Sequence, residues 1–285
     1  MIQFANPSAD LFIPDDFEPS QALGRTTHLG VGAHQDDLEV MALHGILACY
    51  KQSEKWFGGV TVTNGAGSSR TNEYADYTDE QMQAVRAEEQ RKAAVVGEFG
   101  FVAQLGYPSS TVKQPGNSDF AVDLRMILAA TKPEVVYTHN LADKHDTHVA
   151  VVVPLIRALR EMPAAERPVE VYGVEVWRDL NWLLDDEKVL LDMANRPNLV
   201  RALISIFDSQ ISGGKRYDLA LEGRLRSNAT FFDSHAVDDM TLASYAMDLK
   251  PLVDEPSLDI VKYVDGYVER FREDVRSRVS RFTGD

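Results

Sequence analysis

Residues 30–39 have the sequence Gly30-Val31-Gly32-Ala33-His34-Gln35-Asp36-Asp37-Leu38-Glu39. A short apolar run that begins near residue 26 ends here at a histidine and two adjacent carboxylates, and apolar residues at helical spacing follow. This order predicts a β-strand over about residues 26–33, a tight loop, and then one helix to about residue 53. Ligands of open α/β sheets bind at the carboxyl ends of the strands, so we expect a functional site in this loop.

A second polar cluster follows another apolar run, which we predict to be a strand over residues 134–138. The cluster contains His139, Asp143, His145, Asp146 and His148. Two strand ends rich in His and Asp supply the kind of ligands that hold a catalytic Zn²⁺ with one open position. We therefore expect the rest of the chain to be a scaffold that brings the two strand ends together.

The order of elements along the chain predicts the fold class and its division. Apolar runs over residues 60–63, 101–105, 134–138 and 169–176 are separated by helical patterns. This alternation predicts an α/β fold with a mostly parallel sheet and helices on both faces. We divide the chain into an N-terminal arm (1–25), a core that carries the site (26–180) and a helical C-terminal extension packed on the same domain (181–285). In that extension the strand pattern fades, and we expect helices near 186–193, 197–212, 214–222 and 257–280.

The composition excludes several classes of partner. With 44% hydrophobic and 26% charged residues, the 285-residue chain is typical of a soluble globular protein. Its formal net charge of −15 argues against nucleic acid and anionic membrane surfaces as partners, because binding to phosphate backbones depends on Lys and Arg contacts. The sequence shows no signal-peptide pattern and no apolar run long enough to span a bilayer, so we expect a cytoplasmic protein. Assembly into a homo-oligomer is left open.

The two clusters contain the groups that metal-assisted hydrolysis needs. His34 precedes Asp37 by three residues, a spacing that a tight turn folds into one coordination sphere. With His148 they would provide two imidazoles and one carboxylate, the composition of many hydrolytic zinc sites; another divalent metal is an alternative. Asp36 would take a proton from the attacking water, and His145 would donate to the developing oxyanion or to the leaving group.

Simpler interpretations stay open for these residues. A strand-end histidine with two aspartates commonly caps a helix in a solvated loop, and the clusters could bind a ligand without turnover. Arg86 lies in a helical pattern rich in charged residues, where surface ion pairs are common, but it could also contact substrate. Arg178 follows the predicted strand 169–176 at the same edge of the sheet and is a second candidate substrate contact.

Four segments, in the same order, resemble motifs of one enzyme family. Ala33-His34-Gln35-Asp36-Asp37-Leu38-Glu39 resembles the Ala-His-Pro-Asp-Asp-x-Glu signature of the PIG-L/LmbE-like metal-dependent N-deacetylases, and Asp143-Lys144-His145-Asp146-Thr147-His148 resembles their Asp-x-His-x-x-His motif. Arg86-Ala87-Glu88-Glu89 is similar to their Arg-x-x-Glu helix, and Asp208-Ser209-Gln210 to their late His-x-Ser-Gln. The resemblance covers about residues 26–212.

The resemblance implies a Rossmann-like sheet and a mononuclear zinc that hydrolyses an acetamide, commonly on an N-acetylglucosamine-type sugar. The metal ligands implied by position are His34, Asp37 and His148. Asp36 would be the general base, and His145 would stabilise the oxyanion or act as the acid. Arg86 matches the position of an arginine on the substrate side of the pocket.

The chain departs from the family pattern on the side that would bind the sugar. Gln35 replaces the usual proline, which we expect to loosen the turn, and Ser109 and Ser110 stand where an aspartate that contacts the sugar is common. The expected partner is therefore a small N-acylated substrate, either an N-acetylglucosamine-type sugar or a related N-acylated amine. The alternatives are a metallohydrolase that acts on a natural-product amine and a non-catalytic ligand-binding protein.

Overall fold

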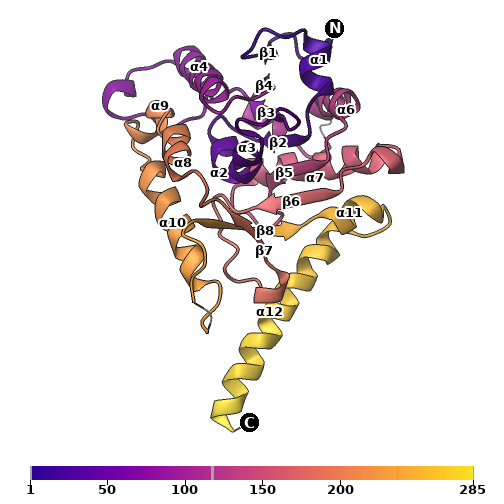
Figure 1. The fold of residues 1–285 in the computed structure, drawn as a ribbon, viewed down its shortest axis with the longest axis vertical. Helices are drawn as coiled ribbons and strands as arrows, with labels where there is room; N and C mark the ends of the chain where they lie inside the picture. Colours follow the sequence, from indigo (N-terminus) through magenta and orange to yellow (C-terminus); the bar gives the residue numbers. More distant parts are fainter. Residues whose placement is uncertain (1, 117–118, 236, 285) are drawn as a thin grey trace.

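Figure 1 shows the computed structural model of the protein, which describes residues 2–116, 119–235 and 237–284. The strands are β1 (Asp10–Phe12), β2 (His28–Gly32), β3 (Phe57–Thr63), β4 (Phe101–Tyr107), β5 (Val135–His139), β6 (Glu170–Val174), β7 (Val189–Asp192) and β8 (Ala243–Asp248). The α-helices are α1 (Pro19–Gly24), α2 (Asp37–Met41), α3 (Leu43–Cys49), α4 (Asp79–Val96), α5 (Ser109–Val112), α6 (Asp119–Thr131), α7 (Asp146–Glu161), α8 (Pro197–Ile204), α9 (Asp208–Ile211), α10 (Tyr217–Phe231), α11 (Lys250–Asp254) and α12 (Ile260–Thr283). The short 3-10 helices are η1 (Asn72–Tyr74), η2 (Ala164–Glu166) and η3 (Asp185–Glu187).

The eight strands form one sheet in the order β1-β4-β3-β2-β5-β6-β8-β7. The five central strands, β4, β3, β2, β5 and β6, are parallel to one another. At the edges, β1 pairs with β4, β8 pairs with β6 and β7 pairs with β8, each antiparallel. The predicted α/β fold with a mostly parallel sheet is therefore confirmed.

Strand β2 lies at the point where the strand order reverses. It pairs with β3 on one side and with β5 on the other, and Val31 of β2 lies opposite Thr138 of β5. The chain therefore continues from β2 toward one edge of the sheet and later returns to build the other edge from β5. In open α/β sheets such a reversal leaves a crevice at the carboxyl ends of the two strands, where ligands bind.

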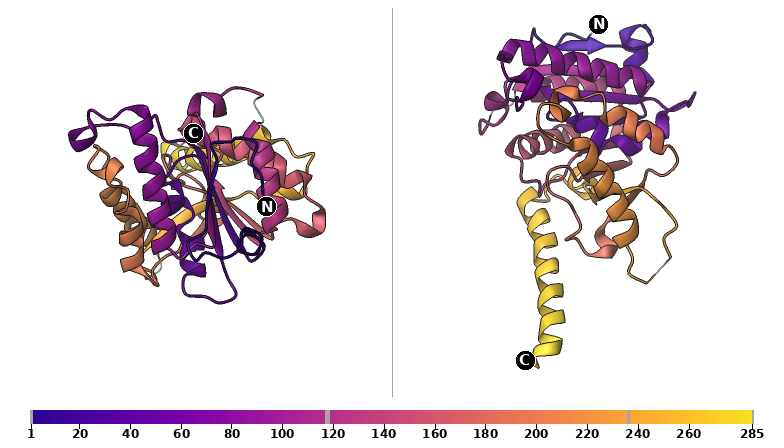
Figure 2. Two further views of the ribbon diagram at one scale, coloured as in Figure 1. Left: turned by 90° about the horizontal axis from the view of Figure 1, so that it is seen from above. Right: turned by 90° about the vertical axis from the view of Figure 1, so that its left-hand side faces the viewer.

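Helices cover both faces of the sheet, as predicted (Figure 2). On one face α6, α7 and α11 bury apolar side chains against residues such as Val31 and Val136. On the other face α2, α3, α8 and α10 pack against Phe57 and Tyr137. Because successive strand residues point to opposite faces, each central strand contributes to both cores. The sheet is thereby a rigid platform for the loops at its carboxyl edge.

Two predictions for the N-terminal part need correction. The arm over residues 1–25 is not wholly irregular, because it contains β1 and α1, and β1 extends the sheet beside β4. The single helix predicted to about residue 53 is two short helices, α2 and α3, which meet at Ala42. Ala42 leaves the helical backbone conformation there (φ −101°, ψ 10°), so the chain changes direction between the two helices.

The prediction that the strand pattern fades after residue 178 is wrong. Residues 189–192, expected within a helix, form β7, and residues 243–248 form β8. Each is short and pairs antiparallel, and β8 is buried along most of its length, so neither shows the polar–apolar alternation of a half-buried strand. Helices do form the rest of this segment, with α10 extending to Phe231, beyond its predicted end.

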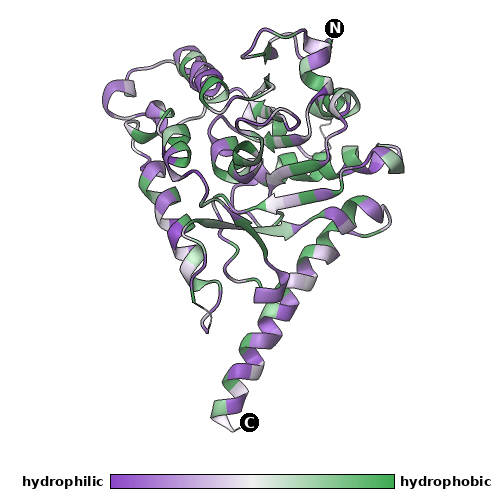
Figure 3. Cartoon of the chain, in the orientation of Figure 1, coloured by the Kyte–Doolittle hydropathy of each residue, from purple (hydrophilic) through white to green (hydrophobic). Residues whose placement is uncertain are grey.

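The last helix, α12, begins against the body and then projects away from it (Figures 1 and 2). Tyr267 is its one buried residue, and Val275 and Phe282 farther along are 43% and 85% exposed. Figure 3 shows apolar and hydrophilic residues interspersed along this projecting part. None of the helices in the described part of the chain is both long and apolar enough to cross a membrane.

The close packing of α2 and α3 on β2 predicts that even one methyl group at Gly30 is destabilising. A Cβ atom there would lie 2.8 Å from Phe57 Cζ, 2.9 Å from Ala42 Cβ and 3.0 Å from a Leu38 methyl carbon. We expect Gly30→Ala to lower the free energy of unfolding by about 1–3 kcal/mol, the usual cost of overpacking a core. Urea denaturation followed by circular dichroism measures this.

Gly24→Ala is the matched control, because a Cβ atom at Gly24 would meet nothing within 4 Å. We expect it to leave the denaturation midpoint unchanged or to raise it slightly, since alanine is the better helix former. Equal losses in the two variants would contradict the packing argument.

Candidate active site

The loop after β2 forms a tight turn that separates its two aspartates. The backbone N–H of His34 donates to Asp37 Oδ2 (2.6 Å), and the Asp37 N–H donates to the His34 carbonyl (3.3 Å). Asp36 lies between them in a left-handed conformation (φ 95°), an uncommon state for a non-glycine residue that clusters at functional sites. Gly32 permits the turn, because a Cβ atom there would lie 2.9 Å from Asp37 Cβ. The two carboxylates consequently point to different partners.

Gln35 anchors this turn, which corrects the expectation that it loosens it. Its side-chain amide is buried and donates to the Thr63 carbonyl (3.0 Å) and to Gln104 Oε1 (3.2 Å). These contacts connect the loop to β3 and β4. A side chain that reaches across the sheet therefore restrains the turn where the family pattern has a proline.

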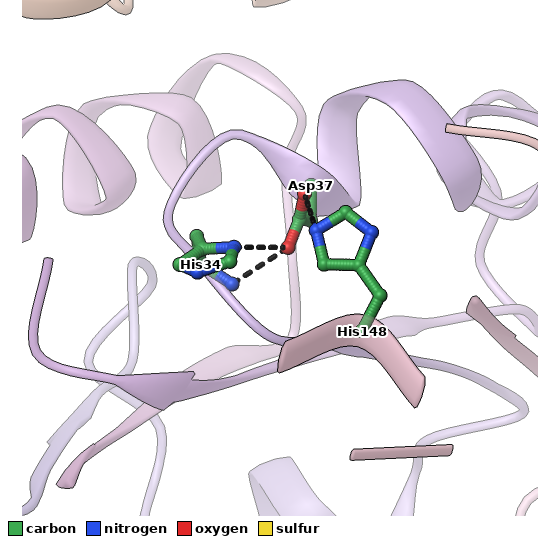
Figure 4. A group of neighbouring side chains, drawn as sticks. All are labelled: His34, Asp37 and His148. Atoms are coloured by element: carbon green, nitrogen blue, oxygen red, sulfur yellow. Dashed lines mark hydrogen bonds and ion pairs between the residues drawn. The ribbon is translucent and has the colours of Figure 1, made fainter. Parts of the chain in front are cut away.

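The structure brings the three predicted metal ligands together at the reversal point of the sheet (Figure 4). His34 Nδ1 lies 3.2 Å from Asp37 Oδ2, and His148 Nε2 lies 3.5 Å from Asp37 Oδ1. One potential ligand atom from each residue lies within 4.8 Å of the others. His148 Nε2 is buried and has no hydrogen-bond partner among the described residues. Two imidazoles, one carboxylate and an unsatisfied buried nitrogen fit a divalent metal ion.

Asp143 orients the His148 ring. Its Oδ2 lies 3.2 Å from His148 Nδ1 and accepts from the Trp177 N–H (3.2 Å), while Oδ1 accepts from the His145 N–H (3.0 Å). Burial raises the pKa of Asp143, but the hydrogen bond and charge of His148 outweigh it and lower the pKa below its ordinary value. A carboxylate on Nδ1 leaves Nε2 as the ligand atom, as is usual for histidines that bind metals.

His139, which the sequence left without a role, supports Asp37 from the other side. Its ring stacks on His148 with centroids 3.7 Å apart, and its Nε2 lies 3.3 Å from Asp37 Oδ2 and accepts from the Ala33 N–H (2.9 Å). Burial, together with the nearby charge of His148, lowers the pKa of His139 to about 4. The ring is therefore neutral near pH 7.

The predicted base, Asp36, faces Arg86. Asp36 Oδ2 lies 3.1 Å from Arg86 Nη2, which also donates to the Gln35 carbonyl. Burial raises the pKa of Asp36 above its ordinary value, although Arg86 lowers it in part. Glu89 on the same helix accepts from Ser209 N–H (2.7 Å) and Oγ–H (2.6 Å) and so connects α4 to α9. Residues 86–89 and 208–210 each resemble a motif of the same enzyme family, and these two segments are thus in direct contact.

Arg86 is buried, but it retains free hydrogen-bond donors. Its Nε and Nη1 have no hydrogen-bond partner among the described residues, and the side chain lines the pocket. Nη1 lies 3.9 Å from Glu89 Oε2. Arg86 thus pairs with Asp36 and Glu89 and donates to the Gln35 carbonyl, and a contact with substrate stays a prediction.

His145 occupies the wall of the pocket beside the candidate ligands. It precedes the first residue of α7, and its ring stacks on His148 (centroids 4.5 Å apart) and meets His34 edge-on (5.0 Å). Burial lowers the pKa of His145 to about 4, with a further contribution from the charges of His148 and His34. A neutral imidazole with an Nδ1 that has no hydrogen-bond partner among the described residues can donate to a reacting group there.

Five of these residues, His34, Asp36, Asp37, Arg86 and His145, line a pocket of about 800 Å³. Residues from most of the chain's length line it: His34, Asp36, Asp37, Val40, Gly65, Gly67, Ser68, Ser69, Arg86, Ser109, Lys113, Lys144, His145, Thr147, Val176, Trp177, Gln210, Lys215, Tyr217, Ala220, Leu221 and Arg224. The volume suits a small-molecule ligand.

Arg178 and Arg224 differ in their relation to this pocket. Arg178 is exposed and is not among the residues that line it, so its substrate role stays a prediction without a supporting contact. Arg224 on α10 does line it, as do Lys215 and Tyr217 just before and at the start of that helix. The sequence offers no signal for these three, because isolated polar residues in a helical segment are usually exposed on the surface.

The fold and the His/Asp group define an α/β protein with a candidate metal site at the reversal point of its sheet. The family model for PIG-L, described as GlcNAc-PI de-N-acetylase, matches residues 29–159, the segment that carries both motif loops. This match covers somewhat less than half of the chain and includes every candidate metal ligand. No curated protein sequence matches the chain.

Several solved structures share the fold. GalB, the 4-carboxy-2-hydroxymuconate hydratase from Pseudomonas putida KT2440, has a TM-score of 0.60 at 17% identity, over 79% of this chain and 96% of that one. N,N′-diacetylchitobiose deacetylase from Pyrococcus horikoshii has a TM-score of 0.61 at 15% identity, over 78% and 83%. Teicoplanin deacetylase Orf2, in a zinc-inhibited form, has a TM-score of 0.54 at 13% identity, over 78% and 97%. At these identities the likeness shows the fold.

The contact between Asp143 and His148 predicts an effect on metal affinity. Asp143→Asn removes the charge that orients His148, and we expect the affinity for Zn²⁺ or Co²⁺ to fall about 10- to 100-fold, as for other carboxylates that support a metal-bound histidine. Competition with a chromophoric chelator measures this affinity.

Asp146→Asn makes the same chemical change on an exposed residue in the first turn of α7. We expect it to leave the affinity within about twofold, because exposed charges contribute little. If the two variants lose affinity equally, Asp143 has no special role in holding His148.

Proposed function

We propose that the protein is a zinc-dependent amide hydrolase that removes the acetyl group from a small N-acetylated amine. One observation carries the proposal: His34, Asp37 and His148 lie close enough together to hold a metal ion, and two of them, His34 and Asp37, line one pocket together with Asp36 and His145. The match of residues 29–159 to the PIG-L family model and the deacetylases among the structural neighbours support hydrolysis of an N-acetyl group.

The three ligands would hold the metal, and their two imidazoles and one carboxylate suit zinc. Teicoplanin deacetylase Orf2, solved in a zinc-inhibited form, is a protein of this fold that zinc affects, and another divalent ion is the alternative. A bound divalent ion would supply Lewis-acid activation of the water and of the acyl carbonyl.

Each remaining group has a role set by its contacts. Asp36 accepts a proton from the water as the water oxygen bonds to the acyl carbon. Arg86 stays paired with Asp36 and holds its carboxylate at the pocket wall. His145 donates a hydrogen bond to the oxyanion that develops on the carbonyl oxygen. The carbon–nitrogen bond then breaks, the amine nitrogen takes up the proton, and acetate leaves.

The proposed substrate is an N-acetylglucosamine-type sugar or a related N-acylated amine. The family description names GlcNAc-PI, and one structural neighbour is a deacetylase of N,N′-diacetylchitobiose. Another neighbour is a deacetylase of teicoplanin, which favours a natural-product amine as the second candidate. A protein that binds such a ligand without turnover is the third.

The role of Asp36 predicts a loss of turnover without a loss of metal. We expect Asp36→Asn to lower the rate of acetate release from N,N′-diacetylchitobiose about 10²- to 10⁴-fold, the usual contribution of a positioned general base. Metal content, measured by elemental analysis on the same samples, should stay at the wild-type level.

His148→Ala is the companion variant, and we expect it to lose metal and turnover together. Full activity in Asp36→Asn would remove Asp36 from the mechanism. Tight zinc binding by the wild type, with no acetate released from N-acetyl sugars or from N-acylated natural-product amines, would favour the non-catalytic binding protein.

A further inference from the structure

Four cationic side chains line the pocket that also contains the candidate metal ligands His34 and Asp37. The chain as a whole is acidic, with 44 Asp and Glu against 29 Lys and Arg. Yet the pocket lining includes Lys113, Lys144, Lys215 and Arg224, and its only carboxylates among the described residues are Asp36 and Asp37. We call these four side chains the cationic wall.

The lysines of the cationic wall carry charges that the protein does not neutralise. Lysines whose Nζ lies within 4.0 Å of a carboxylate oxygen are Lys51, Lys92, Lys132, Lys188 and Lys250. Within the described part of the chain, the lysines without such a partner are Lys55, Lys113, Lys144, Lys215 and Lys262. Three of these five line this one pocket. Unpaired charges of one sign around a cleft raise the local concentration of ligands of opposite sign.

Lys215 is held at the pocket by an aromatic ring. Its Nζ lies 5.2 Å from the centroid of a Trp177 ring, and Trp177 meets Tyr217 edge-on with centroids 6.2 Å apart. A cation over an indole ring is attracted to it but keeps its full charge. Lys215 is thus positioned without being neutralised.

Arg224 has donors that the protein does not use. Its Nη1 donates to the Val176 carbonyl, and Nε and Nη2 make no hydrogen bond to any described residue. The planar guanidinium presents its N–H groups in a fork that matches the oxygens of a carboxylate or a phosphate.

The cationic wall and two of the candidate metal ligands, His34 and Asp37, line the same pocket. The wall comes from four separate segments: the end of α5, the loop before α7, the loop before α10, and α10 itself. The reacting amide must reach Asp36 and His145, so the wall is left for another part of the substrate. A pocket of about 800 Å³ has room for both.

We propose that the physiological substrate carries an anionic group, a carboxylate or a phosphate, that the cationic wall binds while the acylated nitrogen lies at the metal ligands. The inference rests on the proposed function for the identity of the reacting group. It adds the class of substrate, an anionic N-acylated amine.

The first test compares substrates with the same acetamide and different charge. The probes are N-acetylglucosamine, N-acetylglucosamine 6-phosphate and N-acetylmuramic acid, which carry no anion, a phosphate and a carboxylate. We expect kcat/KM for at least one anionic probe to exceed that for the neutral sugar by about tenfold or more, the effect of one charge-assisted hydrogen bond. The excess should shrink as salt is added, because salt screens exposed charges. The better anionic probe identifies the group.

The second test reverses single charges. Lys215→Glu and Lys113→Glu should each lower the ratio of anionic to neutral kcat/KM about tenfold or more. Lys55→Glu is the matched control, since Lys55 is also exposed and unpaired but is not among the residues that line the pocket. We expect it to leave the ratio unchanged. An equal effect at Lys55 and Lys215 would overturn the proposal, because net charge alone would then explain the preference.

The third test separates this inference from the proposed function. Calorimetry with glucosamine and glucosamine 6-phosphate measures binding of the expected products and needs no hydrolysis. Tighter binding of the phosphorylated amine, lost in Lys215→Glu and kept in Lys55→Glu, supports the cationic wall even if no probe is hydrolysed, in which case only the proposed function fails. Equal binding of the two amines, together with equal kcat/KM for charged and neutral probes, overturns the inference.

Discussion

The carboxylate of Asp37 is the constraint on which the site depends. It is 3% exposed and lies among three imidazoles, from His34, His139 and His148. Burial alone would raise the pKa of Asp37, but the charge of His148 and the hydrogen bond from His34 hold it well below its ordinary value. A buried charge is stable only when partners compensate for the lost water. Those partners come from two separate strand ends, so the site exists only when β2 and β5 are neighbours.

The strand order places β2 beside β5 at the point where it reverses, as the site requires. β2 and β5 are parallel neighbours, so the loop after each strand leaves at the same edge of the sheet. The turn after β2 is held by Gln35, which reaches β3 and β4, and α7 begins directly after His145. His148, in the first turn of α7, therefore meets Asp37 at a fixed distance. The helices on both faces hold the strands in place, so the side chains of the site are carried on a rigid framework.

The sequence was sufficient to predict the candidate metal ligands, because their proximity follows from spacing within a turn and from the positions of strand ends. Turn spacing placed His34 beside Asp37, and strand ends at one edge of a parallel sheet placed His148 near both. The strands β7 and β8 were missed because short antiparallel strands at a sheet edge lack a clear period. Lys215 and Arg224 were missed for a different reason: their place in the pocket depends on how α10 packs on the rest of the protein, and the sequence around each residue carries no signal of that packing.

Different segments of the chain supply the candidate metal ligands and some of the other residues that line the pocket. The match to the PIG-L family ends at residue 159, and every candidate metal ligand lies before it. Trp177, Lys215 and Arg224 come after that point, although they line the same pocket. The family segment therefore supports a class of chemistry, while part of the pocket lining comes from a segment outside the family match. Two proteins with this fold can share the metal ligands and still select different substrates. The residues that contact the rest of the ligand can vary independently of the metal ligands.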